Sequence, residues 1–374
     1  MLLLSYTNRA IDEICSKLVE EGIDFIRIGS KDSCADDYHP YLLENKVEEC
    51  RNVQALKEVI SSMRVFVCTT AKLNANISLF NIKQFSLAII DEASQILEPH
   101  LAGILGAQHC GNPAIKKFVM IGDHKQLPAV VQQTADESKV RDPQLNDILL
   151  TDCAISLFER LLKRYGNAPS VSYMLTRQGR MHPEIADFPN QAFYEGKLKA
   201  VPLPHQQEFL AGRISFIDTK PLQASNSDKV NQSEADIIAA AVVRIYEDNK
   251  NTFDATSTIG VIVPYRNQIA AIRNTIDNYN IPILHDITID TVERYQGSQR
   301  DHIIYGFTIK KKYQLNFLTE NTFEENGNII DRKLNVAMTR ARKSLTLVGN
   351  ASLLSLNPVF RKLIEYVKER NFLS

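Results

Sequence analysis

The chain has 374 residues, with 43 lysines and arginines against 44 aspartates and glutamates, so its formal net charge is −1. At roughly 100–200 residues per domain this length predicts two or three domains, and the balanced charge excludes a polycation that coats nucleic acid over its whole surface. Any nucleic-acid site must therefore be local, and the 44% of hydrophobic residues is typical of a folded chain.

The sequence carries no sign of export or membrane insertion. It contains no apolar run near the roughly 18 residues that span a bilayer. Residues 1–9 lack the charged and apolar regions of a signal peptide. The six cysteines are far apart and form no C-x-x-C pair, a spacing typical of reduced thiols rather than of a disulfide framework or a zinc site. We therefore expect a cytoplasmic protein with no membrane partner.

Short β-branched or leucine-rich runs alternate with amphipathic patterns along the chain. Strands are predicted, in chain order, at residues 2–5, 65–69, 87–91, 118–122, 214–218, 259–263, 287–291, 303–308 and 345–348. Apolar residues at helical spacing predict helices around residues 11–18, 155–165 and 269–279. This alternation indicates α/β architecture with mostly parallel sheets flanked by helices.

Turn-forming residues at 166–170 separate two such series of strands and helices. We therefore predict a first domain over residues 1–168 and a second over residues 169–374. Residues 30–50, 131–150 and 219–232 are rich in Asp, Ser, Asn and Gln without clear periodicity, and we predict that they are insertions.

The first segment with chemical information is LAIIDEASQ, residues 87–95, which places Asp91 and Glu92 directly after a buried strand. The open end of a parallel sheet presents such side chains to ligands. As a Walker B site, Asp91 would hold Mg²⁺ and Glu92 would position and deprotonate an attacking water. The alternative for these residues alone is an acidic helix cap after a core strand.

The second segment, FVMIGDHKQLP at residues 118–128, ends a strand in a glycine turn that projects Gln126. An uncharged amide can donate to a γ-phosphate oxygen and accept from water, so Gln126 could report whether that phosphate is present. An ordinary Gly-Asp turn is the alternative.

The second half of the chain offers two arginines beside a turn or a helix start, Arg180 in QGRMHP and Arg340 in TRAR. Guanidinium groups suit a transferring phosphoryl because they spread charge over several donors and stay protonated. The two arginines predict an intramolecular pair of arginine fingers, whereas either alone could be a surface or salt-bridged residue. A polar loop at residues 290–301, with Gly297 and Gln299, could add nucleotide contacts.

Taken in this order, the segments resemble the motifs of superfamily 1 helicases, in the branch that contains the nonsense-mediated-decay RNA helicase and the replication helicase–nuclease. The matching segments are residues 5–12, 67–70, 91–95, 122–128, 178–183, 188–190, 193–194, 263–268, 295–297 and 334–341. They cover nearly the whole chain, and the ordered set carries the resemblance rather than any single motif.

The resemblance implies two RecA-like domains, with ATP and Mg²⁺ in the cleft between them and single-stranded DNA or RNA across both. The residues it assigns to ATP or Mg²⁺ are Asp91 (Mg²⁺), Glu92, Gln126, Arg180, Gly297, Gln299 and Arg340. The residues it assigns to the nucleic-acid strand are Thr7, Asn8, Thr69, Tyr265, Arg266 and Thr291. Hydroxyls, amides and an arginine suit backbone phosphates, and Tyr265 could stack on a base or be a half-buried core aromatic.

The sequence departs from the family pattern in two respects. No Gly-x-x-x-x-Gly-Lys-Ser/Thr loop occurs in the 374 residues. Because the phosphates then lack a cradle, we expect this chain alone to hydrolyse ATP poorly or not at all, and to depend on a missing N-terminal segment with that Walker A loop, in cis or in trans. Gly179 stands where an adenine-stacking tyrosine is common, so base selectivity could be loose or a different side chain could fill the place. Gln299 stands where glutamate is usual; its amide can still hydrogen-bond a ribose hydroxyl but brings no charge.

Three hypotheses follow. The first is the core of an ATP-driven helicase or translocase. The second is a nucleic-acid-binding module without ATP hydrolysis, a truncated or regulatory relative, whose strand binding would not respond to ATP. The third is an unrelated α/β nucleotide-binding enzyme, which would need substrate-specific residues that the sequence does not offer.

Overall fold

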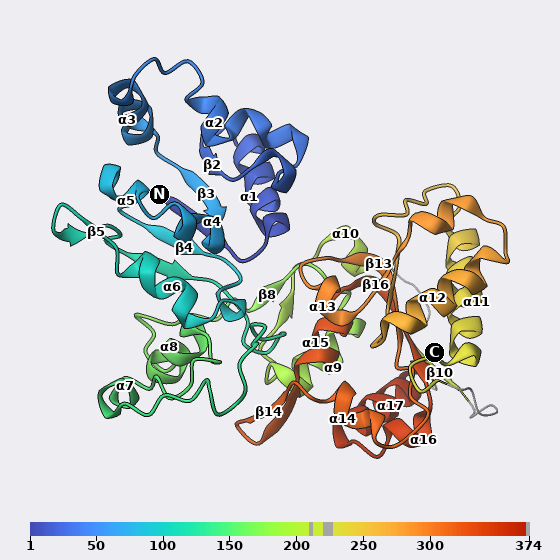
Figure 1. Cartoon of the computed structure of the whole chain (residues 1–374). Helices are drawn as coiled ribbons and strands as arrows, with labels where there is room; N and C mark the ends of the chain where they lie inside the picture. Colours follow the sequence, from blue (N-terminus) through green and yellow to red (C-terminus); the bar gives the residue numbers. More distant parts are fainter. Residues whose placement is uncertain (209–211, 220–226, 372–374) are drawn as a thin grey trace. The chain divides into compact units, whose positions relative to one another are not determined.

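The computed structural model describes residues 1–208, 212–219 and 227–371, and the chain divides into two compact units. The first unit comprises Met1–His124 and Pro128–Tyr173, and the second comprises Lys125–Leu127 and Met174–Ser374 (Figure 1). The short segment Lys125–Leu127 thus belongs to the second unit although the chain on both sides of it belongs to the first. Residues 220–226 of the predicted insertion at 219–232 lie outside the described residues.

The first unit is built on a parallel sheet with the strand order β2-β3-β1-β4-β7. Its strands are β1 (Leu2–Ser5), β2 (Ile26–Ile28), β3 (Phe66–Thr69), β4 (Ala88–Ile90) and β7 (Phe118–Met120). Side chains alternate between the faces, so Leu2 and Leu4 pack in one apolar cluster while Leu3 packs against another that contains Ile11 of α1 (Asn8–Glu20). Figure 1 shows α1 on one side of these strands and α5 and α6 on the other.

The helices of the first unit are α1 (Asn8–Glu20), α2 (Leu43–Lys46), α3 (Val53–Ser62), α4 (Thr70–Ala75), α5 (Leu79–Ile82), α6 (Glu98–Leu105), α7 (Pro143–Asp147) and α8 (Leu157–Tyr165). Side-chain caps fix several starts; the Ser156 hydroxyl, for example, accepts from the backbone N–H of Glu159 at the beginning of α8. A small antiparallel pair, β5 (Gln108–His109) and β6 (Asn112–Pro113), follows α6.

Strand β7 departs from the buried pattern of its neighbours. It lies at the edge of the sheet, and Phe118 and Val119 are 45% and 47% exposed, as is Ile121 just after it at 46%. Successive residues of a strand point to opposite faces, so the apolar surface of β7 is open on both. The apolar run in the sequence predicts a strand covered on both faces, and the structure leaves this one uncovered.

The second unit has its own parallel sheet, with the order β10-β16-β13-β11-β12. Its strands are β10 (Ile214–Asp218), β11 (Ile259–Ile262), β12 (Thr288–Asp290), β13 (Arg300–Gly306) and β16 (Ala341–Gly349). Ile303 and Tyr305 face one apolar cluster and Ile304 faces another. The second of these clusters lies under α11 (Gln232–Asp248) and α12 (Arg266–Asp277), which stand together on one side of the unit in Figure 1.

The helices of the second unit are α9 (Pro183–Phe193), α10 (Pro204–Gln207), α11 (Gln232–Asp248), α12 (Arg266–Asp277), α13 (Val292–Tyr295), α14 (Gln314–Leu318), α15 (Arg332–Met338), α16 (Ala351–Leu354) and α17 (Pro358–Asn371). Two small strand pairs complete it. One is parallel, β8 (Arg177–Gln178) with β9 (Lys199–Ala200), and the other is the hairpin of β14 (Thr322–Glu325) and β15 (Asn328–Asp331).

The predicted fold class is confirmed: both main sheets are parallel and flanked by helices, as two RecA-like domains require. Each predicted strand is present, and only β2 among the strands of the two main sheets was not predicted. Within the described residues, no helix is both long and apolar enough to cross a membrane.

Candidate functional site

The acidic pair of the first unit stands at the carboxyl end of β4. The backbone N–H of Asp91 donates to the carbonyl oxygen of Leu4 at 2.7 Å, which extends the pairing with β1 to the point where Asp91 leaves the sheet. Glu92 then adopts a left-handed conformation, with φ at 51°, and its Oε2 accepts from Nε2 of Gln95 at 2.7 Å. A non-glycine residue in this conformation is energetically costly, and such residues gather at functional sites.

Burial raises the pKa of Asp91, against a smaller lowering by the backbone N–H of Glu92. Its carboxylate is therefore a group that a nearby cation would stabilise. Two hydroxyls in the same region, those of Ser5 and Ser94, are buried without a hydrogen-bond partner in the described part of the chain. This corner of the first unit thus holds polar groups whose bonding capacity is not used within the fold.

The donor set fits one kind of metal site. In the described ranges no group of three or more His, Cys, Asp or Glu side chains could hold a metal ion. Mg²⁺ commonly binds one or two carboxylates and takes its other ligands from water and substrate phosphates. Asp91 therefore suits a Mg²⁺ that arrives with a phosphate ligand, and the donors do not suit an ion enclosed by protein alone.

The glycine turn after β7 packs directly against the chain that follows Glu92. A Cβ atom on Gly122 would lie 2.9 Å from the backbone N of Ser94 and 3.3 Å from that of Ala93. The N–H of Ala93 also donates to the carbonyl of Ile121 at 2.8 Å. Glycine at position 122 therefore permits a backbone approach that holds the acidic segment in place.

Three of the predicted strand-binding residues share this edge of the first sheet. Thr7 and Asn8 follow β1, Thr69 ends the adjacent strand β3, and the register pairs Ser5 with Thr69. The Thr7 hydroxyl accepts from the N–H of Ala10, and that of Thr69 accepts from the N–H of Lys72, each at 3.2 Å. Both threonines therefore cap helices, a structural role that was not predicted from the sequence.

In the second unit, Arg340 is buried and several hydrogen bonds hold its guanidinium group. Its Nη2 donates to Oε1 of Gln126 at 2.9 Å and to the Thr339 hydroxyl at 3.2 Å. Its Nε donates to the carbonyl of Val336 at 3.1 Å and Nη1 to that of Ser298 at 3.4 Å. The structure thus brings together the predicted phosphate sensor and one predicted arginine finger.

Arg180 joins the same network. Its Nε donates to Oε1 of Gln299 at 3.0 Å, and its Nη1 donates to the carbonyl of Thr339 at 3.3 Å. Gly297, with φ at +79°, makes the turn that leads to Gln299, a conformation that favours glycine. The predicted residues Gln126, Arg180, Gly297, Gln299 and Arg340 therefore form one continuous cluster of the second unit.

The remaining predicted strand-binding residues follow two adjacent strands of the second sheet. Tyr265 and Arg266 begin α12 after β11, and Thr291 precedes α13 after β12. Arg266 is exposed, whereas the ring of Tyr265 stacks on that of Phe317, with centroids 5.0 Å apart and planes 17° apart. Phe317 therefore covers one face of the tyrosine, which limits base stacking to its other face.

Gly179, where the family resemblance leads one to expect an aromatic side chain, lies against Leu203. A Cβ atom at position 179 would be 3.1 Å from Cδ1 of that leucine, which is 39% exposed. Leu203 is the neighbouring side chain that offers apolar surface at this place.

Two buried residues of this region were not predicted from the sequence. Lys125 is only 8% exposed, and Asn335 is fully buried with its Nδ2 donating to the carbonyl of Lys125 at 2.7 Å. Both lie inside motif segments, Lys125 in residues 122–128 and Asn335 in residues 334–341, but neither has a periodicity or spacing that would predict its burial. A lysine beside a charged turn is usually solvated.

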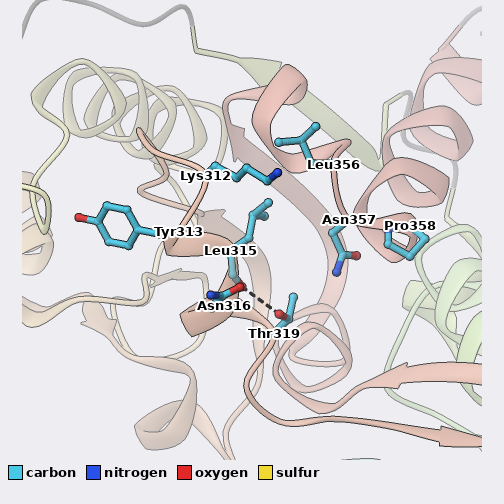
Figure 2. A pocket seen from close by; sticks show the side chains of 8 residues that line it. All are labelled: Lys312, Tyr313, Leu315, Asn316, Thr319, Leu356, Asn357 and Pro358. Carbon is cyan, nitrogen blue, oxygen red and sulfur yellow. Dashed lines mark hydrogen bonds between the residues drawn. The ribbon is translucent and has the colours of Figure 1, made fainter.

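A separate pocket of about 520 Å³ opens in the second unit beside α14 and the start of α17 (Figure 2). Lys312, Leu315, Leu356 and Asn357 line it, and Figure 2 shows the lysine chain extending toward its centre. None of the predicted site residues lines this pocket. It is therefore distinct from the cluster around Arg340.

Comparison with known proteins identifies the class of protein. AAA domain families match residues 49–134 and residues 153–352, and the second match alone covers more than half of the chain. The chain belongs to these families and, within them, to the superfamily 1 helicases of the replication helicase–nuclease branch. The resemblance predicted from the motifs is confirmed.

Individual relatives show the same relationship. The chain is 29% identical over 371 residues to the DNA replication ATP-dependent helicase/nuclease DNA2 of Gallus gallus, across 97% of this chain and 33% of that protein. It is 30% identical over 330 residues to the uncharacterized ATP-dependent helicase MJ0104 of Methanocaldococcus jannaschii, across 84% of this chain and 43% of that protein. The chain thus spans less than half the length of these relatives.

Among solved structures, the chain is similar to an Arterivirus nonstructural protein 10 helicase in complex with DNA. The TM-score is 0.46 and the sequence identity 14%, and the match covers 92% of this chain and 53% of that one.

Proposed function

We propose that this chain is the motor core of an ATP-dependent helicase or translocase, which hydrolyses ATP and moves along single-stranded nucleic acid. The observation that carries the proposal is the cluster around Arg340, in which a buried guanidinium donates to the amide oxygen of Gln126 at 2.9 Å. Arg180, the second predicted arginine finger, donates to Oε1 of Gln299 at 3.0 Å in the same cluster, and guanidinium groups suit the charge of a transferring phosphoryl.

In the proposed reaction, water attacks the γ-phosphorus and the bond to the β–γ bridging oxygen breaks, so that ADP leaves. Glu92 accepts the proton of the attacking water, with its carboxylate oriented by the Gln95 amide at 2.7 Å. Asp91 would hold Mg²⁺, and the ion would supply positive charge to the triphosphate when bound. Gln126 contacts the γ-phosphate, and Arg180 and Arg340 stabilise the charge that it develops.

The strand-binding part of the proposal rests on Thr7, Asn8 and Thr69 in the first unit and Tyr265, Arg266 and Thr291 in the second. These residues would contact the sugar–phosphate backbone of DNA or RNA. With a net charge of −1 over the chain, the affinity should depend on salt through a few phosphate contacts only.

A phosphate-binding loop is the part of the proposed machinery that the 374 residues do not contain. We propose that it is supplied in cis or in trans, and that the 374-residue chain alone hydrolyses ATP slowly or not at all. This same feature favours a second candidate function, a nucleic-acid-binding module without ATP turnover.

Replacing Glu92 with glutamine separates the two candidates in the protein at its full natural length. For the motor, ATP hydrolysis in the presence of single-stranded DNA or RNA should fall at least about 100-fold, while strand affinity stays within twofold. Glu21→Gln, at an exposed position after α1, is the matched control and should leave both unchanged. Equal and negligible hydrolysis by the wild type and Glu92→Gln would favour the binding module.

A further inference from the structure

The side chain of Lys125 is buried between acidic and aromatic groups of the second unit. Its Nζ donates to the carbonyl of Phe193 at 2.8 Å and lies 2.5 Å from Oε2 of Glu325 and 3.9 Å from Oε1 of Glu195. It also lies 5.9 Å from the centre of the Tyr194 ring. These groups come from the end of α9, the turn after it and the end of β14.

The backbone of Lys125 is held as well. Asn335 of α15 donates through Nδ2 to the Lys125 carbonyl at 2.7 Å and to the Tyr194 hydroxyl at 2.8 Å. Leu127, two residues on, is 4% exposed and packs in the main apolar cluster of the second unit. Gln126 therefore lies between two residues that are both anchored in this unit.

An ammonium group in this position is expensive to bury and requires paired charges around it. Removing a carboxylate therefore leaves the buried ammonium group with less compensating charge, whereas the side chains of Glu195 and Glu325 are themselves 31% and 30% exposed. Glu195 is itself fixed, since it accepts from Asn326 at 3.0 Å and pairs with Lys197 at 2.7 Å. The turn after α9 and the β14–β15 hairpin thus supply the two carboxylates that lie beside the Lys125 ammonium group.

We propose that Lys125 is a positioning residue, which through Glu325 and Glu195 fixes the amide of Gln126 against Arg340. The claim rests on the proposed function, because it gives Gln126 the role of γ-phosphate contact. Lys125 touches neither nucleotide nor metal in this scheme. It acts through Gln126, whose side chain would otherwise populate several rotamers.

Steady-state ATP hydrolysis by Lys125→Met, Gln126→Ala and the double variant tests the proposal in the full natural protein. Each single variant should lower kcat about 10- to 100-fold with little change in KM for ATP, because a displacement of about 1 Å costs that much in a positioned group. The double variant should be no slower than Gln126→Ala, because one residue acts through the other. Multiplied losses in the double variant would overturn the proposal.

Two further variants guard against a change in folding. Glu325→Gln leaves Lys125 with Glu195 and the Phe193 carbonyl, and should give a smaller loss of kcat in the same direction. Lys250→Met removes an exposed lysine of the same unit and should change nothing. If Glu325→Gln has the wild-type kcat and Lys250→Met has a lower one, then the loss of any lysine charge lowers kcat. This result would refute the proposal.

A structural readout separates this proposal from the proposed function. Without nucleotide, amide hydrogen exchange in residues 125–127 should be faster in Lys125→Met than in the wild type or Lys250→Met. If exchange is faster in Lys125→Met but the protein shows no ATP hydrolysis, Lys125 still anchors the segment and the proposed motor function is rejected. Unchanged exchange would reject the anchoring role, whatever the activity.

Discussion

Replacing Gly122 with alanine tests the contact that holds the acidic segment of the first unit. The added Cβ would lie 2.9 Å from the backbone N of Ser94, closer than the 3.0 Å that real Cβ contacts reach. Because its neighbours are backbone atoms, the chain after Glu92 must shift. Overpacking of this kind costs about 1–3 kcal/mol, and the lower entropy of the unfolded alanine chain offsets about 0.4–1 kcal/mol. The net loss of unfolding free energy should be about 1–2 kcal/mol.

Urea unfolding followed by far-ultraviolet circular dichroism measures this loss, since the chain has no tryptophan to report by fluorescence. Gly103→Ala is the matched control within α6, where the new Cβ would meet only Oδ1 of Asn74 at an ordinary 3.5 Å. A helical glycine replaced by alanine should gain about 0.5–1 kcal/mol, so the two variants should shift in opposite directions. If Gly122→Ala unfolds at the wild-type urea concentration or above it, the close approach is refuted.

Three other perturbations probe the two units. Arg160→Met removes a guanidinium that binds both carboxylate oxygens of Glu98, at 2.7 and 2.5 Å, and should lower the unfolding free energy by about 1.5–3 kcal/mol; an unchanged urea midpoint would contradict this. Burial raises the pKa of Glu234 to about 8, so its protonated form is favoured in the fold. The unfolding free energy should therefore fall as pH rises from about 4.5 to 8, by up to about 1.4 kcal/mol per pH unit, and Glu234→Gln should remove this dependence; identical slopes for wild type and variant would contradict it. Finally, Val119→Lys adds a charge to a side chain that is 47% exposed on the edge strand β7, so the unfolding free energy should change by less than about 0.5 kcal/mol; a larger fall in the urea midpoint would contradict the exposure of this edge.

Much of the candidate site could be predicted because its residues follow strands. Asp91 after β4, Thr69 at the end of β3 and Thr291 after β12 all stand at carboxyl ends of parallel strands. Side chains at such ends meet at one edge of a sheet whatever the details of packing. Alternation of apolar runs and amphipathic segments is a local property, so it predicts strands and helices without knowledge of their neighbours.

The residues that the sequence reading missed depend on contacts between distant segments. The three residues of β2, Ile26–Ile28, are too few to show a periodic pattern and become a strand through pairing with β3. The hydroxyl of Thr69 could serve a ligand or a helix cap with the same residue type, and only the bond to Lys72 shows the cap. Likewise, nothing in the local sequence distinguishes the stacked Tyr265 from an exposed one.

By itself, the sequence determined the order of the motifs, the parallel α/β class and the residue types available for phosphate chemistry, because these follow from chain order and local patterning. Only the tertiary structure decided that the segment Lys125–Leu127 belongs to the second unit and that Gln126 meets Arg340 there. The reason is physical: the ion pair between Lys125 and Glu325 joins residues that are remote along the chain, and only the folded unit brings their charged groups to 2.5 Å from one another.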